Sequence, residues 1–244
     1  MSISQRELSL LRERLTDEAE LALAVERVEN GEPLAYVLGE WYFYGLTFKL
    51  NRDCLIPRPD TEHIVDKAIS LLPRGGRFTD LCSGSGCIAI SVLYSRPDTV
   101  GEAVEISPLA HAVSVENGEA CGVSERFYPV CGDIFEYTPK EKYDCVISNP
   151  PYIRSSVIPT LDVSVKEHEP LRALDGGESG MDFYRYILNA YRACLTDGGC
   201  FIFEIGYDQR EDITALAREL GYGYCAVEKD YGGNDRVAVI REHE

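Results

Sequence analysis

Arg77-Phe78-Thr79-Asp80-Leu81-Cys82-Ser83-Gly84-Ser85-Gly86 runs from an apolar strand pattern into a glycine-containing turn that opens a helix. Such a turn places backbone N–H groups and the positive end of a helix beside a ligand, and its glycines allow a close approach. The spacing differs from the Gly-x-Gly-x-x-Gly pattern of dinucleotide-binding folds. A plain tight turn would use the same residues, so this segment alone predicts a strand–helix unit and leaves a ligand site open.

The alternation of strand and helix continues toward the C-terminus. Strands are predicted at 78–82, 100–105, 127–130, 143–148, 200–205, 222–227 and 236–240, and helices near 86–95, 107–121, 181–195 and 209–220. This series indicates an α/β fold with a mostly parallel, doubly wound sheet of seven strands and helices on both faces. The connection from 228 to 235 is short enough for a hairpin, so the last strand is expected to be antiparallel.

The residues before the sheet divide into two shorter parts. Residues 1–30 are predicted to be a short helical segment, because Ser4-Gln5-Arg6-Glu7 has the pattern of a capping box and apolar residues follow at helical spacing. Residues 31–60 are aromatic and β-branched between turn signals, which predicts a β-hairpin linker. Residues 61–244 then form the sheet domain.

The composition argues against several classes of protein. Lys and Arg number 24 against 41 Asp and Glu, which gives a net charge of −17 and a pI of about 4.7. There is no basic run, so direct binding to nucleic acid is not expected. No apolar run reaches the roughly 18 residues that a membrane span needs, and the start has no signal-peptide core. We therefore expect a protein of the cytoplasm with no membrane association.

Cysteine and histidine give no sign of a metal site. The nine cysteines include no Cys-x-x-Cys pair, and their odd number does not favour a disulfide framework. The four histidines show no spacing typical of metal ligands or of a catalytic pair. Free thiols in a reducing compartment fit this pattern best.

Two acidic residues follow predicted strands at informative positions. Glu105 ends the second strand of the series, 19 residues after Gly86. A carboxylate about 20 residues beyond such a turn is placed to accept hydrogen bonds from both ribose hydroxyls of an adenosine. Asp133 follows the third strand, where it could bind the adenine amino group while Ile134 packs on the ring. Either acid could also be an ordinary polar residue at a strand end.

The fourth strand ends in Ser148-Asn149-Pro150-Pro151-Tyr152, the most informative segment of the chain. Two consecutive prolines stiffen the backbone and remove two N–H donors. The side-chain oxygen of Asn149 and the carbonyl of Pro150 can then both accept hydrogen bonds from one –NH₂ group. Tyr152 offers a flat face to a planar amide or base. The carboxyl ends of parallel strands are where open α/β sheets bind ligands, although a structural Asn-Pro turn remains an alternative.

With these motifs the chain resembles the S-adenosylmethionine-dependent methyltransferases, whose Asn-Pro-Pro-Tyr tetrad accompanies methylation of amino groups. More narrowly it resembles the HemK/PrmC family, the peptide chain release factor N(5)-glutamine methyltransferases. The resemblance covers about residues 31–240. It is carried by the tetrad and by the segments Pro33 to Glu40, Leu55 to Glu62, Glu169 to Gly177, Phe203 to Gly206 and Asp230 to Arg236.

The resemblance implies a Rossmann-like class I methyltransferase domain and a specific reaction. The methyl group of S-adenosylmethionine would pass to the side-chain amide nitrogen of Gln in the Gly-Gly-Gln motif of a release factor, leaving S-adenosylhomocysteine. Asn149 and Pro150 would be catalytic, and Asn149, Pro150, Pro151 and Tyr152 would bind the substrate. The residues expected to bind the methyl donor are Asp80, Cys82, Ser83, Gly84, Ser85, Gly86, Glu105, Asp133, Ile134 and Asn149.

The chain departs from the family pattern at two points. Cys82 stands where the family usually has glycine, and it would be strained if that position needs a positive φ. The family's N-terminal helical domain is also longer than residues 1–30 allow, which leaves open how a release factor docks.

Other functions remain open from the sequence. They are methylation of Gln in a ribosomal protein, methylation of adenine in nucleic acid, or a non-catalytic adaptor with the same fold. An enzyme acting on adenine would be expected to carry a basic face or a target-recognition domain. We expect a monomer whose partner is the protein substrate.

Overall fold

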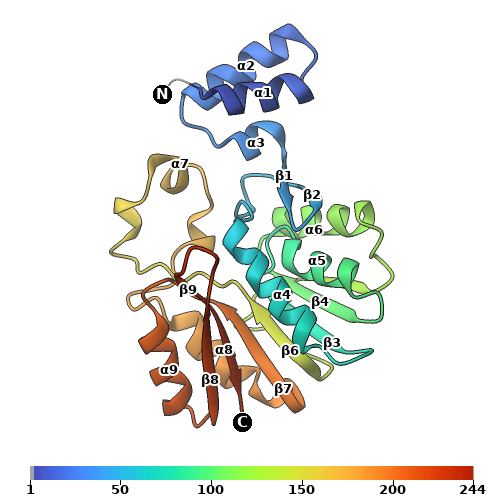
Figure 1. The fold of residues 1–244 in the computed structure, drawn as a ribbon, viewed down its shortest axis with the longest axis vertical. Helices are drawn as coiled ribbons and strands as arrows, with labels where there is room; N and C mark the ends of the chain where they lie inside the picture. The colour runs from blue at the N-terminus through green and yellow to red at the C-terminus, as the bar shows by residue number, and fades with distance from the viewer. Residues whose placement is uncertain (1–2, 244) are drawn as a thin grey trace.

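A seven-stranded sheet forms the centre of the computed structural model, which describes residues 3–243 (Figure 1). Its strands are β3 (Arg77–Leu81), β4 (Val100–Glu105), β5 (Phe127–Cys131), β6 (Tyr143–Ser148), β7 (Leu195–Glu204), β8 (Tyr224–Lys229) and β9 (Asp235–Arg241). They lie in the order β5-β4-β3-β6-β7-β9-β8, and neighbours are parallel from β5 to β7. Strand β9 is antiparallel to both β7 and β8, so the predicted α/β fold with an antiparallel last strand is confirmed.

Helices cover both faces of this sheet, as expected. One face packs against α4 (Glu62–Leu71), α5 (Cys87–Ser95) and the end of α6 (Pro108–Ala120), and the other packs against α8 (Asp182–Ala190) and α9 (Arg210–Glu219). Successive side chains of a strand point to opposite faces. In β7, Ile202 accordingly belongs to the first core, whereas Phe201 and Phe203 belong to the second.

The helix predicted at 181–195 is wrong at its C-terminal end. Helix α8 stops at Ala190, a 3₁₀ turn follows at Arg192–Cys194, and β7 already begins at Leu195. The buried Tyr191 donates its hydroxyl to the carbonyl of Ile134, and Arg192 donates to the carbonyl of Leu220. These tertiary contacts override the helical pattern of the sequence.

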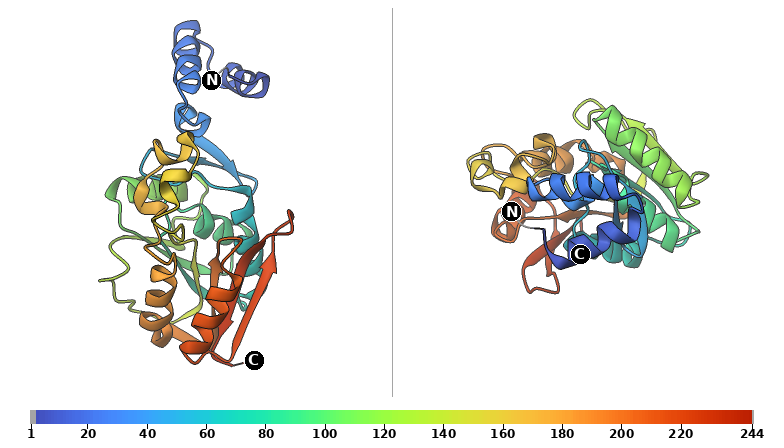
Figure 2. Two further views of the ribbon diagram at one scale, coloured as in Figure 1. Left: turned by 90° about the vertical axis from the view of Figure 1, so that its left-hand side faces the viewer. Right: turned by 90° about the horizontal axis from the view of Figure 1, so that it is seen from above.

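The N-terminal region projects from the sheet domain and folds around a small core of its own (Figure 2). It consists of α1 (Gln5–Arg14), α2 (Glu18–Glu29) and α3 (Leu34–Leu38), and the hairpin of β1 (Glu40–Phe43) and β2 (Leu46–Lys49) connects it to the sheet domain. The predicted capping box at Ser4 and the predicted hairpin are both present. Helix α3 was not predicted, because five residues are too few to show a helical period.

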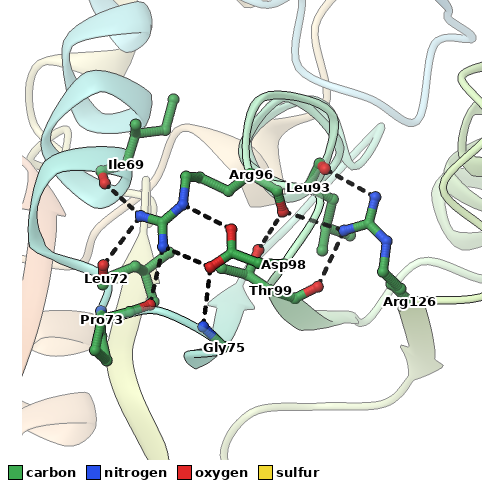
Figure 3. A network of polar contacts seen from close by, with 9 residues as sticks. All are labelled: Ile69, Leu72, Pro73, Gly75, Leu93, Arg96, Asp98, Thr99 and Arg126. Carbon is green, nitrogen blue, oxygen red and sulfur yellow. Dashed lines mark hydrogen bonds and ion pairs between the residues drawn. The ribbon is translucent and has the colours of Figure 1, made fainter.

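Arg96 and Arg126 donate hydrogen bonds to backbone carbonyls at the C-terminal ends of α4 and α5, on the first face of the sheet (Figure 3). Arg96 donates to the carbonyls of Ile69, Leu72 and Pro73 at the end of α4, at 2.8, 3.0 and 2.9 Å, and also pairs with Asp98. Arg126 donates in the same way to the carbonyl of Leu93 in the last turn of α5 and to those of Arg96 and Thr99 beyond it. The last carbonyls of a helix have no partner within the helix, and these guanidinium groups supply one.

A long excursion between β6 and α8 lies at the carboxyl end of the sheet. It contains the short helix α7 (Val163–Lys166) and two 3₁₀ turns, Ile158–Thr160 and Leu171–Ala173, and a parallel bridge pairs Ile153 with Asp175. An ion pair between Arg58 and the buried Glu169 ties it to the segment that follows the hairpin. Within residues 3–243, no helix is both long and apolar enough to span a membrane.

Candidate active site

A pocket of about 300 Å³ opens at the carboxyl ends of β3, β4 and β6. Strand β3 pairs with β4 on one side and with β6 on the other, so the chain reverses its direction of winding between β3 and β6. Open α/β sheets bind their ligands in the crevice at such a reversal. The lining residues are Asp53, Leu55, Cys82, Gly84, Val104, Glu105, Ile106, Asp133, Ile134, Phe135, Asn149, Pro151, Arg172, Ala173 and Phe183.

The structure gathers residues that the sequence had predicted separately. The predicted residues among the pocket lining are Cys82, Gly84, Glu105, Asp133, Ile134, Asn149 and Pro151. The predicted residues outside the lining are Asp80, Ser83, Ser85, Gly86, Pro150 and Tyr152. Asp80 lies within β3 itself, and the other five belong to the turn after β3 or to the tetrad after β6, so all six lie within one or two residues of the lining.

The turn after β3 has a positive φ at Cys82, the position where the family usually has glycine. Cys82 has a φ of 61°, in the left-handed region that non-glycine residues seldom occupy, and Gly84 and Gly86 also have positive φ values. The N–H of Ser83 donates to the carbonyl of Val104 at 3.1 Å. The turn is therefore fixed against β4 in spite of the strain at Cys82.

Glu105 is held rigidly at the pocket wall. Its Oε2 accepts the N–H of Gly84 at 2.8 Å, and its Oε1 accepts the N–H of Ser107 at 2.8 Å. Burial raises the pKa of Glu105, although these two hydrogen bonds act in the opposite direction. Each carboxylate oxygen has a further lone pair. The carboxylate can therefore accept additional hydrogen bonds from a ligand without moving.

Asp133 and Ile134 form the neighbouring part of the wall, beyond the end of β5. The Oδ1 of Asp133 accepts the N–H of Phe135 at 2.9 Å, which fixes the direction of the carboxylate. Ile134 is buried and lines the pocket together with the more exposed Phe135. A carboxylate beside apolar side chains suits a flat heterocycle that carries a hydrogen-bond donor.

Asp80 lies behind the turn instead of in the pocket. Its Oδ2 accepts the N–H of Ala89 at 3.2 Å, and burial raises the pKa of Asp80 to about 8. The atoms Asp80 Oδ1, Ser83 Oγ and Ser85 Oγ are buried and have no hydrogen-bond partner among residues 3–243. Buried polar atoms normally have partners. Unpaired oxygens around this turn fit a polar ligand that carries hydrogen-bond donors or positive charge.

The tetrad after β6 is braced from several sides. Ser148 donates its hydroxyl to the carbonyl of Leu81 at 2.6 Å, which joins the ends of β6 and β3. The Nδ2 of Asn149 donates to Oγ1 of Thr61 at 3.4 Å. The hydroxyl of Tyr152 donates to Oε1 of the buried Glu204 at 3.2 Å, and burial raises the pKa of Tyr152. The tetrad is thus a fixed element beside the pocket.

Sequence reasoning missed several residues of the pocket. Asp53 and Leu55 come from the segment after the hairpin, and Arg172 and Ala173 come from the excursion after β6. Neither segment is part of the strand–helix series, so no strand end indicated their position. The pairing of Arg58 with Glu169 links the two segments, and only the tertiary structure shows it.

Known proteins are similar to this chain in sequence or in fold. The model of the methyltransferase small domain family matches residues 62–163. A release factor glutamine methyltransferase of Agrobacterium fabrum is 36% identical over 231 residues, covering 92% of this chain and 80% of that protein. One from Geobacter sulfurreducens is 38% identical over 213 residues, covering 87% and 74%.

A solved structure agrees at the level of the fold. The methyltransferase from Pyrococcus furiosus superposes with a TM-score of 0.64 at 17% identity, covering 90% of this chain and 98% of that one. This likeness concerns the fold alone, whereas the two relatives are similar over most of their own sequences. The chain belongs to the release factor glutamine methyltransferase family.

Proposed function

We propose that this protein transfers a methyl group from S-adenosylmethionine to the side-chain amide nitrogen of Gln in the Gly-Gly-Gln motif of a peptide chain release factor. The observation that carries the proposal is the position of Asn149, which follows β6 and lines the pocket bordered by the turn after β3. Family membership supports the choice of reaction. Translation termination, and hence this reaction, belongs to the cytoplasm.

The pocket residues suit the parts of the methyl donor. Glu105 would accept the ribose hydroxyls, and Asp133 would accept the adenine amino group while Ile134 packs against the ring. The unpaired oxygens of Asp80, Ser83 and Ser85 lie near the turn, where the positively charged methionine portion would lie. When bound, the donor supplies an electrophilic methyl group on a sulfonium.

Asn149 and Pro150 would hold the nucleophile. An amide nitrogen is a poor nucleophile, because its lone pair is delocalised into the carbonyl. Two fixed acceptors, the side-chain oxygen of Asn149 and the carbonyl of Pro150, would bind both N–H groups and direct the nitrogen toward the methyl group. They would bind more strongly as positive charge grows on that nitrogen in the transition state. Once the nitrogen has accepted the methyl group in place of the breaking C–S bond, it would release one of its two protons to water. Pro151 and Tyr152 would support the flat amide from the side.

The test is a methyl-transfer assay with the intact release factor. The purified chain is incubated with labelled S-adenosylmethionine, and peptide mass analysis locates the modification. The expected result is one added methyl group on the Gln of Gly-Gly-Gln, and none on a release factor in which that Gln is replaced. Parallel reactions with ribosomal protein and with DNA test the alternatives, and a product in one of those reactions alone would overturn the proposal.

An Asn149→Ala variant then tests the mechanism. We expect turnover to fall by about 100-fold, by analogy with the loss of one preorganised group that stabilises transition-state charge. Donor affinity, measured by calorimetry with S-adenosylhomocysteine, should change much less. Near-normal turnover in this variant would refute the role given to the Asn149 oxygen.

A further inference from the structure

We propose that Thr61 is a positioning residue whose buried hydroxyl determines which end of the Asn149 carboxamide faces the pocket. The proposal rests on the proposed function in one respect, since the orientation matters to catalysis only if Asn149 receives a substrate amide. Thr61 lies at the start of α4, far from the tetrad in sequence.

The first support is the contact itself. The Nδ2 of Asn149 donates to Oγ1 of Thr61, at 3.4 Å. A carboxamide has a donor at one end and an acceptor at the other, and a half-turn exchanges them. With its nitrogen bound by Thr61, Asn149 has its oxygen available as an acceptor. The flipped arrangement would present N–H groups to the N–H groups of the incoming amide, and the two would repel.

The second support is that the Thr61 hydroxyl makes no capping hydrogen bond to α4. Thr61 ends the 3₁₀ turn Pro59–Thr61 and enters α4 with helical dihedral angles, so its side chain is not placed to accept a backbone N–H of the first turn. The residue is only 2% exposed, so its hydroxyl is buried beside the tetrad. The contact with Asn149 accounts for a polar group that the helix does not use.

The third support is the buried carboxyl of Glu204 at the end of β7. Glu204 is 2% exposed and accepts the hydroxyl of Tyr152 at 3.2 Å. Burial raises the pKa of Glu204, and Thr61 is among the neighbouring groups that act to lower it. The Oε2 of Glu204 is buried and has no hydrogen-bond partner among the described residues. An unpaired carboxylate oxygen favours a neighbouring hydroxyl that turns its proton toward it, and a Thr61 hydroxyl turned that way can serve Asn149 only as an acceptor.

A pair of substitutions at Thr61 tests the proposal. Thr61→Val keeps the shape and removes the hydroxyl, and we expect it to lower kcat by about tenfold or more, with donor affinity unchanged. Thr61→Ser restores a hydroxyl and should recover most of that loss. The matched control is Thr79→Val on β3, which removes a fully buried hydroxyl with no partner among the described residues and should leave kcat unchanged. A normal kcat in Thr61→Val would overturn the proposal.

A second measurement does not depend on activity. In the ¹⁵N-labelled protein, the side-chain amide protons of Asn149 are assigned by their disappearance in Asn149→Asp. We expect Thr61→Val to shift these resonances and speed their exchange with water, and Thr61→Ser and Thr79→Val to leave them near the wild-type values. Unchanged resonances in Thr61→Val would refute the proposal. Wild-type protein that leaves release factors unmethylated would instead count against the proposed function, and the spectra would still decide the role of Thr61.

Discussion

The carboxylate of Glu105 is held in place by two backbone N–H groups, and each of its oxygens keeps a lone pair for a ligand. We therefore expect the affinity for the methyl donor to depend most on this residue. We expect Glu105→Ala to weaken binding of S-adenosylhomocysteine by about tenfold or more, because charge-assisted hydrogen bonds to the ribose are lost. Calorimetry measures the affinity. The matched control is Glu116→Ala, an exposed acid paired with Lys49 on the surface of α6. Equal affinity in the wild type and Glu105→Ala would contradict the ribose assignment.

Asp80 gives the fold a pH dependence of defined sign. Its pKa is raised by burial from 3.8 to about 8, so between these values the folded protein keeps a proton that the unfolded chain releases. Stability conferred by the neutral carboxyl is therefore lost as the pH rises through this window. In Asp80→Asn, the free energy of unfolding should fall less between about pH 4 and pH 8 than it does in the wild type. Chemical denaturation at several pH values measures this difference. Identical pH profiles in the two proteins would contradict the assignment.

Residues at strand ends could be predicted from the sequence, whereas residues that act across the fold could not. Glu105 ends one apolar strand and Asn149 directly follows another, and the carboxyl ends of parallel strands meet at one edge. Thr61 contacts Asn149 across 88 positions of the chain, and no local pattern reports such a contact. From the sequence, Cys82 was predicted to be strained only if its position requires a positive φ. The sequence does not reveal backbone dihedral angles, so the φ of 61° could be read only from the structure.

At the scale of the elements, Arg96 fastens the end of α4 to the loop before β4. It makes three hydrogen bonds to backbone carbonyls, all of which Arg96→Met would remove, although the carbonyl of Pro73 would keep the N–H of Gly76. We expect the free energy of unfolding to fall by about 2 kcal/mol, as measured by urea denaturation. Arg185→Met, which removes the exposed ion pair between Arg185 of α8 and Glu219 of α9, is the control and should cost less than about 1 kcal/mol. Equal losses in the two variants would contradict the role given to Arg96.

The strands of the sheet were predictable because their buried faces leave continuous apolar runs in the sequence. The structure agrees with the predicted β4 and β6 at both ends. Helix ends were less predictable, since Tyr191 and Arg192 find partners elsewhere in the fold and stop α8 early. The segment between β6 and α8 shows neither a helical nor a strand periodicity in its apolar residues. The contribution of Arg172 and Ala173 to the pocket could therefore be seen only in the structure.

At the scale of the whole molecule, Glu32 connects the N-terminal helices to the segment after the hairpin. Arg27 of α2 binds both of its carboxylate oxygens, at 2.7 and 2.8 Å, and Arg52 adds a third contact at 2.8 Å. The hydrogen bonds from Arg27 contribute most to lowering the pKa of Glu32, from 4.5 to about 2. A depressed carboxyl pKa stabilises the fold above the unfolded value, and this contribution is lost as the pH falls toward 2.

Glu32→Gln should therefore loosen the N-terminal helices at pH 7. Hydrogen exchange in α2 should be faster in the variant, and the difference from the wild type should shrink below about pH 4.5. Exchange in β3, within the sheet, serves as the internal control and should stay the same. A difference that stays constant from pH 7 to pH 3 would contradict the ionic origin of the link. The division at residues 30 and 60 itself stays a prediction.

The proposed reaction depends on Asn149 and Pro150, which would hold the substrate amide for methyl transfer. The most direct measurement is a crystal structure of the protein with S-adenosylhomocysteine and a release factor that carries Gly-Gly-Gln. We expect the Gln nitrogen to lie within about 3 Å of both the Asn149 side-chain oxygen and the Pro150 carbonyl, and to face the donor sulfur. A Gln nitrogen beyond hydrogen-bond reach of both oxygens, or an Asn149 side chain turned away from the bound product, would contradict this expectation.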